Sequence, residues 1–253
     1  MKRRKFLYST MAAGAALPLT SFANQPTQET KEKELYEIRT YEMKFGASQQ
    51  VLQSYLSDVL APSLMRMGAT TFKLYGELGN SAPTKIYALI SYPNSEVYLK
   101  AQNLNNDGKY VTAAAKYNAL PPEKTLYNRF SSSLLLAFDG MPKMMEPIDG
   151  ASLFELRTYE GYSEDAVRRK IKMFNDGEID IFLKTGLHPV FFGEMIVGPY
   201  RPCLTYMLNF KDMDEHDANW KRFSSNSDWE SMKTKEEYAN TVSNIRKIFL
   251  SPL

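Results

Sequence analysis

Charged and apolar residues alternate along Leu35–Met43, which is the spacing of a strand with one buried face. The following segment, Ser48–Met67, instead carries apolar residues at helical spacing and stops at Gly68. Beyond it the pattern predicts two strands, a polar helical region and a last strand, over residues 70–79, 84–93, 95–118 and 125–138. The predicted order, β-α-β-β-α-β, is that of a ferredoxin-like unit.

The same pattern occurs a second time further along the chain. The stretch "LYEIRTYEM" begins at Leu35 and "LFELRTYEG" begins at Leu153, a separation of 118 residues. "YALISYPN" from Tyr87 and "TYMLNFKD" from Thr205 keep that separation. In the second copy Ser163 is a suitable N-cap for the first helix. Because several landmarks recur in the same order, we infer an internal duplication.

The duplication assigns residues 35–138 to a first unit and 151–253 to a second, joined by a Pro- and Gly-rich linker over 139–150. A ferredoxin-like unit carries helices on one face of its sheet, so its other face needs cover. Two units in one chain can cover each other. We therefore predict an α+β fold in which two tandem ferredoxin-like βαββαβ units pack sheet to sheet as a pseudo-two-fold barrel.

The N-terminal residues are expected to be a targeting segment. "MKRRKFL" is basic, and the mildly apolar stretch after it ends in small residues at Ser21 and Ala23. We expect residues 1–23 to be a signal peptide cleaved before Asn24, and the polar residues 24–34 to be a flexible leader. The pair Arg3-Arg4 favours twin-arginine export over general secretion. The mature protein would then be periplasmic or secreted, without a stable membrane anchor.

Charge and cysteine content exclude several functions. The whole chain carries +2, and losing four N-terminal cations leaves about −2, so no basic surface for nucleic acid is expected. The single cysteine, Cys203, cannot form an internal disulfide, and we expect it to be a buried apolar residue. His188 and His216 do not have the spacing of a metal site. We therefore expect neither a metal nor a cofactor.

Several segments resemble the NIPSNAP family, a branch of the dimeric α+β barrel superfamily. They are the strands "FELRTYE" and "LTYMLNF", the segment "DWESM" and the closing "FLSPL". The resemblance extends over roughly residues 35–253 and is clearest in the second unit. The first unit has "DGKY" where the second has "SDWE". The resemblance implies the barrel fold but little chemistry, although the wider superfamily includes small monooxygenases and haem-handling enzymes.

Two charged trios are the main candidates for a ligand site. Alternation along a strand puts Glu, Arg and Tyr on one face, and we expect Ile38 to face the helices. Both trios would then lie in the barrel interior, and two glutamates that follow glycines are expected to line the same lumen. The candidates are Glu37, Arg39, Tyr41, Glu77, Glu155, Arg157, Tyr159 and Glu194.

These residues allow two interpretations. An Arg could hold a carboxylate or an enolate-like oxygen while a Tyr donates a hydrogen bond or a proton. Alternatively, Glu and Arg pair with each other across the sheet and only stabilise the duplicated interface. In either case Arg39 and Arg157 are expected within hydrogen-bonding reach of a carboxylate.

Three functional hypotheses follow. The first is an exported protein that binds a small apolar or aromatic molecule with an acidic group in the barrel interior. The second is a cofactor-independent, monooxygenase-like oxidoreductase, and the third is a structural or interaction module without a ligand. An open interior of a few hundred cubic ångströms would favour the first two. The sequence leaves the ligand and the oligomeric state open, a homodimer included.

Overall fold

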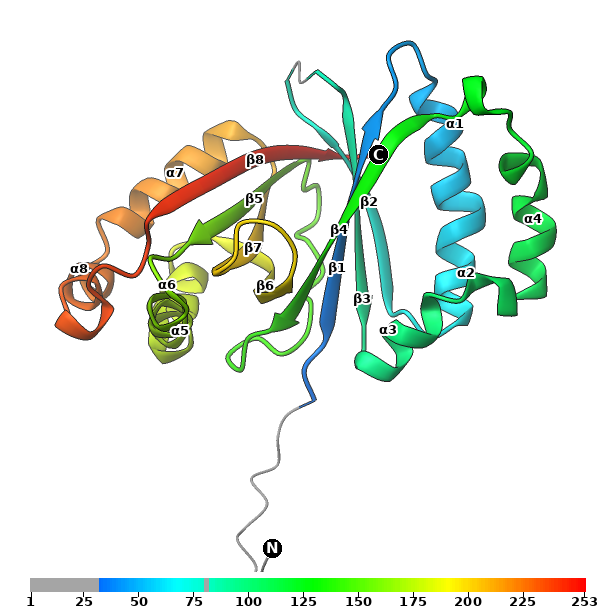
Figure 1. Ribbon diagram of the computed structural model, residues 1–253. Helices are drawn as coiled ribbons and strands as arrows, with labels where there is room; N and C mark the ends of the chain where they lie inside the picture. The colour runs from blue at the N-terminus through cyan, green and yellow to red at the C-terminus, as the bar shows by residue number, and fades with distance from the viewer. Residues whose placement is uncertain (1–31, 80–81) are drawn as a thin grey trace, which may run out of the picture. The chain divides into compact units, whose positions relative to one another are not determined.

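Eight antiparallel strands close into a barrel in the order β1-β3-β2-β8-β5-β7-β6-β4 (Figure 1). The computed structural model describes residues 32–79 and 82–253. The predicted signal peptide therefore lies outside the described residues. The strands are β1 Leu35–Met43, β2 Thr71–Glu77, β3 Lys85–Tyr92, β4 Tyr127–Ala137, β5 Leu153–Glu160, β6 His188–Val197, β7 Cys203–Phe210 and β8 Asn244–Pro252.

Each half of the barrel is one βαββαβ unit, so the predicted fold class is confirmed. Strands β1–β4 belong to the first half and β5–β8 to the second. The halves are joined edge to edge: β2 pairs with β8 through Tyr75–Glu77, and β4 pairs with β6 through Leu134–Ala137. The two open sheet faces thus become the inner wall of one continuous barrel, and the linker crosses between the halves.

Helices cover the outside of each half. The first half has α1 Gln49–Ser54, α2 Ala61–Arg66, α3 Ser95–Ala101 and α4 Gly108–Asn118. The second half has α5 Glu164–Met173, α6 Ile179–Lys184, α7 Met213–Ser224 and α8 Ser227–Lys233. Ser163 caps α5 by accepting a hydrogen bond from the Ala166 N–H, as the sequence predicted. No helix in the described ranges is long and apolar enough to span a bilayer.

The first helix of each half contains a π-helical segment that the periodicity did not indicate. The segment is η1 Tyr55–Leu60 in the first half and η4 Phe174–Glu178 in the second. Within η4, Gly177 has a φ of 154°, which favours glycine. A π segment widens a helix locally and often occurs at functional sites.

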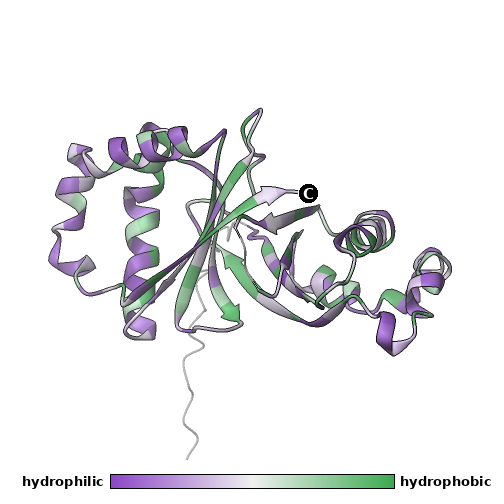
Figure 2. Ribbon diagram, turned by 90° about the horizontal axis from the view of Figure 1, so that it is seen from above, coloured by the Kyte–Doolittle hydropathy of each residue, from purple (hydrophilic) through white to green (hydrophobic). Residues whose placement is uncertain are grey.

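Apolar side chains form three clusters, one under the helices of each half and one inside the barrel. Figure 2 shows the hydrophobic positions concentrated along the strands and on the sheet-facing sides of the helices. The inner cluster includes Tyr36, Leu89, Leu135, Phe191 and Met207, each at most 1% exposed. An eight-stranded barrel is just wide enough for side chains to fill its interior. Side chains of the inner cluster occupy much of this interior.

Candidate functional site

The Glu-Arg-Tyr trios lie between the sheet and the helices, and the prediction that they face the barrel interior is wrong. Tyr41 belongs to the apolar cluster under the first-half helices, and Tyr159 belongs to the corresponding cluster of the second half. Ile38, expected under the helices, packs inside the barrel. The alternation was correct but the faces were exchanged. The physical reason is hydrogen bonding. On this face Glu37 finds partners on β3 and β4, and Glu155 finds one on α7, whereas the inner cluster is apolar.

The expectation that each arginine reaches a carboxylate is confirmed. Arg39 binds Glu37 through two hydrogen bonds, from Nε to Oε1 at 2.8 Å and from Nη2 to Oε2 at 3.0 Å. Arg157 Nη1 lies 2.7 Å from Glu155 Oε1. Each pair joins residues two apart on one strand, where side chains share a face, rather than residues across the sheet.

The two other glutamates do not share a lumen. Glu77 lies near the Tyr87 hydroxyl on the inner side, and burial and the Glu77 charge raise the pKa of Tyr87. Glu194 is exposed beside α5. A bulge in β6 at Val190 explains the difference: Gly76 pairs with Ile86, while Glu194 occupies the equivalent position opposite Leu204. A one-residue shift moves a side chain to the other face.

In the second half, Glu155 and Arg157 are part of a larger polar network. Glu155 is fully buried and accepts a hydrogen bond from Trp220 Nε1 at 2.9 Å. His216 Nε2, from the same helix α7, lies 3.3 Å from Glu155 Oε2, the oxygen that accepts the Trp220 bond. The Arg157 guanidinium carbon lies 4.4 Å from the centre of the Trp220 ring, so the cation also contacts an aromatic face.

Tyrosines extend this network across the sheet. Arg157 Nη2 donates to the Tyr159 hydroxyl at 3.2 Å, and the Tyr206 hydroxyl donates to the same oxygen at 2.8 Å. Burial raises the pKa of both tyrosines, so they remain hydrogen-bond donors at neutral pH. The result is a chain of donors that runs from β5 to β7 under the helices.

A buried ion pair lies against the tyrosines. Lys170 of α5 and Glu178 of η4 are 5% and 2% exposed, and Lys170 Nζ lies 2.6 Å from Glu178 Oε2. Lys170 Nζ also lies 4.6 Å from the centre of the Phe174 ring and 5.4 Å from that of Trp229. Burial raises the pKa of Glu178, although the lysine charge opposes this shift. A buried carboxyl group with a shifted pKa and a specific charged partner is a candidate member of a functional site.

The first half forms the same fold without this network. Lys170 and Glu178 correspond, 118 residues earlier, to Leu52 and Leu60, which are both buried. On the strands, Arg39 stands opposite Ala88, whereas Arg157 stands opposite Tyr206. Because apolar residues suffice at these positions in one half, folding alone does not explain the polar residues in the other.

In the first half, other residues donate hydrogen bonds to the carboxylate of the Glu-Arg pair. Glu37 accepts hydrogen bonds from the Tyr92 hydroxyl at 2.9 Å and from Ser132. Burial alone would raise the pKa of Glu37, but the bonds from Arg39, Ser132 and Tyr92 outweigh it and lower the pKa. This carboxylate is therefore held ionised, which is the behaviour of a structural pair.

Sequence analysis missed Lys170, Glu178, Tyr206, His216 and Trp220 as members of a site. The available signal was the repeat itself. Comparing the copies at a spacing of 118 shows Leu52 replaced by Lys170, Leu60 by Glu178 and Ala88 by Tyr206. Charged or phenolic residues at positions where the other copy is apolar indicate a function beyond packing.

Comparison with known proteins supports the fold. The NIPSNAP family model matches residues 154–253. No curated protein matches the chain in sequence. Two solved structures named "putative monooxygenase" are similar over most of the chain. The Fusobacterium nucleatum protein has a TM-score of 0.58 at 11% identity, covering 88% of this chain and 94% of its own. The Lactobacillus acidophilus protein has a TM-score of 0.54 at 12% identity, covering 87% and 94%.

A shorter structure matches part of the chain. It is an uncharacterised NIPSNAP-like domain protein from Burkholderia xenovorans, with 13% identity and a TM-score of 0.37, covering 41% of this chain and 87% of its own. At these identities the likeness of the two longer structures concerns the fold alone. Residues 154–253 of this chain are therefore a NIPSNAP domain, set in an α+β barrel of the kind seen in the two longer structures.

Proposed function

We propose that the second half binds a small aromatic molecule with an anionic group, between its sheet and its helices. The observation that carries this proposal is the difference between the halves. Lys170, Glu178 and Tyr206 replace Leu52, Leu60 and Ala88 at equivalent positions of one fold. Replacing apolar core residues by a buried ion pair gives little stability and often costs some. A ligand is a physical reason to keep the pair.

The chemistry of the site favours an anion. Arg157 and Lys170 are cations that both lie against the Tyr159 ring, and burial raises the pKa of Glu178, the carboxyl group that pairs with Lys170. Arg157 Nε is buried and has no hydrogen-bond partner among the described residues. An anionic oxygen of the ligand would accept hydrogen bonds from both Arg157 Nε and Lys170 Nζ. Phe174, Trp220 and Trp229, which contact the two cations, would pack on the aromatic part of the ligand.

Access is possible at the edge of this layer. The side chains of Arg157 and His216 are 11% and 13% exposed, while Glu155 beneath them is fully buried.

A second function, cofactor-independent oxidation, is favoured by the raised pKa of Glu178. A carboxylate formed there could accept a proton from a phenol or enol. Arg157 would hold the resulting anion, which would pass one electron to dioxygen. The substrate radical and superoxide would then join through a new carbon–oxygen bond, and the peroxide would take up the proton held by Glu178. The names of the two longer barrel structures agree with this alternative but concern those proteins only. The third hypothesis, a module without a ligand, agrees with the filled barrel interior.

We also propose export through residues 1–23, which gives a mature chain that starts at Asn24. A homodimer is compatible with the fold. It is not needed to cover the sheets, because one chain closes the barrel by itself.

The proposed site can be tested by native mass spectrometry of the mature protein isolated from its own compartment. We expect a small molecule to remain bound to the wild type and to be lost from Arg157→Met. Arg39→Met, the same change in the first half, is the matched control and should retain it. Equal loss from both variants, or a wild type without any ligand, would count against a site in the second half.

A further inference from the structure

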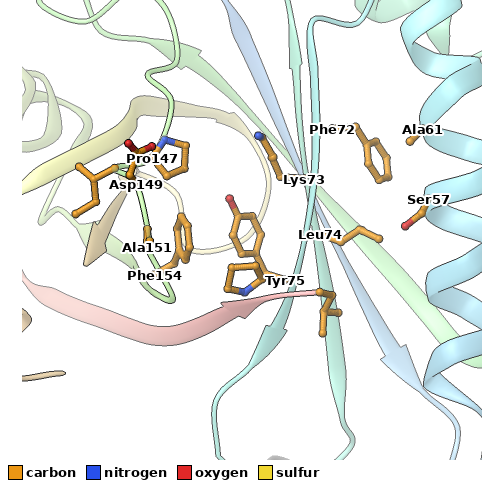
Figure 3. Close-up of a pocket in the computed structure, with 14 residues that line it drawn as sticks. Ser57, Ala61, Phe72, Lys73, Leu74, Tyr75, Pro147, Asp149, Ala151 and Phe154 are labelled. Carbon is orange, nitrogen blue, oxygen red and sulfur yellow. The ribbon is translucent and has the colours of Figure 1, made fainter. Parts of the chain in front are cut away.

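A groove runs along the edge of β2 where this strand leaves β8, and none of the residues of the proposed site lines it (Figure 3). Pairing with β8 covers Tyr75–Glu77, and within the described ranges no strand pairs with this edge at Thr71, Phe72 or Lys73. The groove has a volume of about 530 Å³, which suits a small molecule.

Two apolar walls enclose the groove. Ser57 and Ala61 of the first-half helix lie on one side, with Phe72 of β2 (Figure 3). Linker residue Pro147 and Phe154 of β5 lie on the other. The walls thus come from both halves and from the linker, so this space exists only in the assembled barrel.

Tyr75 supplies a polar group at the base of the groove. The residue is 2% exposed, and its ring lies 4.8 Å from that of Phe154. Its hydroxyl points into the groove on the side of Lys73 (Figure 3). No residue that the structure describes forms a hydrogen bond with this hydroxyl. Since burial raises the pKa of Tyr75, the hydroxyl is a donor at neutral pH.

Lys73 is available as a cation beside this hydroxyl. Its ammonium lies 3.1 Å from Glu146 Oε2, but both side chains are well exposed, at 43% and 77%. Such a surface pair is weak and can open for a ligand. Asp149 lines the far side of the groove and would repel a second negative charge.

The other joint of the barrel cannot offer the same site. Gly193 occupies the position of Tyr75, because it pairs with Thr205 as Tyr75 pairs with Tyr87. A side chain on Gly193 would begin 2.7 Å from Leu135 Cβ. The phenol is therefore present at one joint and sterically excluded from the other.

We propose that this groove is a second small-molecule site, specific for a flat aromatic compound with one carboxylate or carbonyl oxygen. The aromatic body lies along the unpaired edge of β2, with Phe72 on the helix side of the strand and Phe154 on the inner side. The oxygen accepts a hydrogen bond from Tyr75, and Lys73 pairs with the charge when the oxygen is a carboxylate. This proposal is independent of the site around Lys170.

The test uses 2-naphthoate and its uncharged analogue 2-naphthamide as probes, with binding followed by saturation-transfer NMR. We expect Tyr75→Phe to weaken both probes by about tenfold, the typical effect of one lost hydrogen bond. Lys73→Met should weaken 2-naphthoate only. Ala61→Trp, which fills the groove from the helix side, should abolish both signals.

Two control variants should leave the affinities for both probes unchanged. One is Tyr98→Phe, at a residue outside the groove, and the other is the double variant Lys170→Leu/Glu178→Leu. The proposal is overturned if neither probe binds, or if Tyr75→Phe leaves both affinities at the wild-type value. Should Ala61→Trp fail to fold, the comparison of Tyr75→Phe with Tyr98→Phe decides alone.

Discussion

Lys170 Nζ and Glu178 Oε2 lie 2.6 Å apart in a layer where the other half of the barrel has two leucines. Both side chains are almost fully buried and surrounded by aromatic rings. This pair is thus a buried chemical difference between two halves that share one fold.

Removing one member of the pair should destabilise the protein strongly. Lys170→Leu would leave Glu178 buried without its partner, and breaking a buried pair costs about 3–5 kcal/mol. Urea denaturation should show this loss in the free energy of unfolding. Leu52→Ala in the first half measures the separate effect of a cavity. A loss below about 1 kcal/mol for Lys170→Leu would mean that the pair is solvated in solution.

The raised pKa of Glu178 predicts a pH dependence of stability with a definite sign. Between the ordinary carboxyl value of 4.5 and its higher value in the folded state, the folded protein binds more protons at Glu178 than the unfolded chain. The contribution of this group is therefore fully present below pH 4.5 and is lost as pH rises through the folded pKa. Subtracting the unfolding curve of Glu178→Gln from that of the wild type, at several pH values, should isolate this fall. A difference that grows with pH would contradict the direction of the shift.

Substitutions at Arg157 should distinguish a structural role of this residue from a ligand-binding role. As a purely structural partner, Arg157→Met would strand Glu155 and cost about 3–5 kcal/mol, and adding Glu155→Gln would recover much of that loss. As a ligand-binding residue, the single change would also abolish binding, and the second change would not restore it. Thermal melts and ligand retention on both variants separate the two roles. We expect stability to recover and binding to stay absent.

The duplicated architecture was predictable because the repeat and the alternation of strand residues survive in the sequence. The face of the sheet on which each trio lies was not predictable. Alternation places Glu37, Arg39 and Tyr41 together but does not indicate which side is the barrel interior. Glu194 was placed wrongly because a bulge at Val190 shifts β6 by one residue, and a bulge leaves no mark in the hydrophobic pattern. The Lys170–Glu178 pair lies eight positions apart along one helical run, where a charged pair is ordinarily solvated. Only the leucines of the other copy distinguish it.

The export proposal is tested by N-terminal sequencing of the mature protein. The small residues at Ser21 and Ala23 place the cleavage before Asn24. Replacing Arg3-Arg4 by Lys-Lys should block export if the twin-arginine route is used and leave it unchanged in general secretion. Recovery of the protein from the cytosol as an unprocessed chain, with Met1 intact, would contradict export by either route.

The most direct test of the central claim is the double variant Lys170→Leu/Glu178→Leu, which gives the second half the leucines of the first. We predict that its free energy of unfolding stays within about 1 kcal/mol of the wild type or rises, because apolar residues often replace a buried ion pair without loss. In native mass spectrometry the same protein should no longer retain the small molecule that Arg157→Met also loses. A variant that is as stable as the wild type and still retains the ligand would contradict the account.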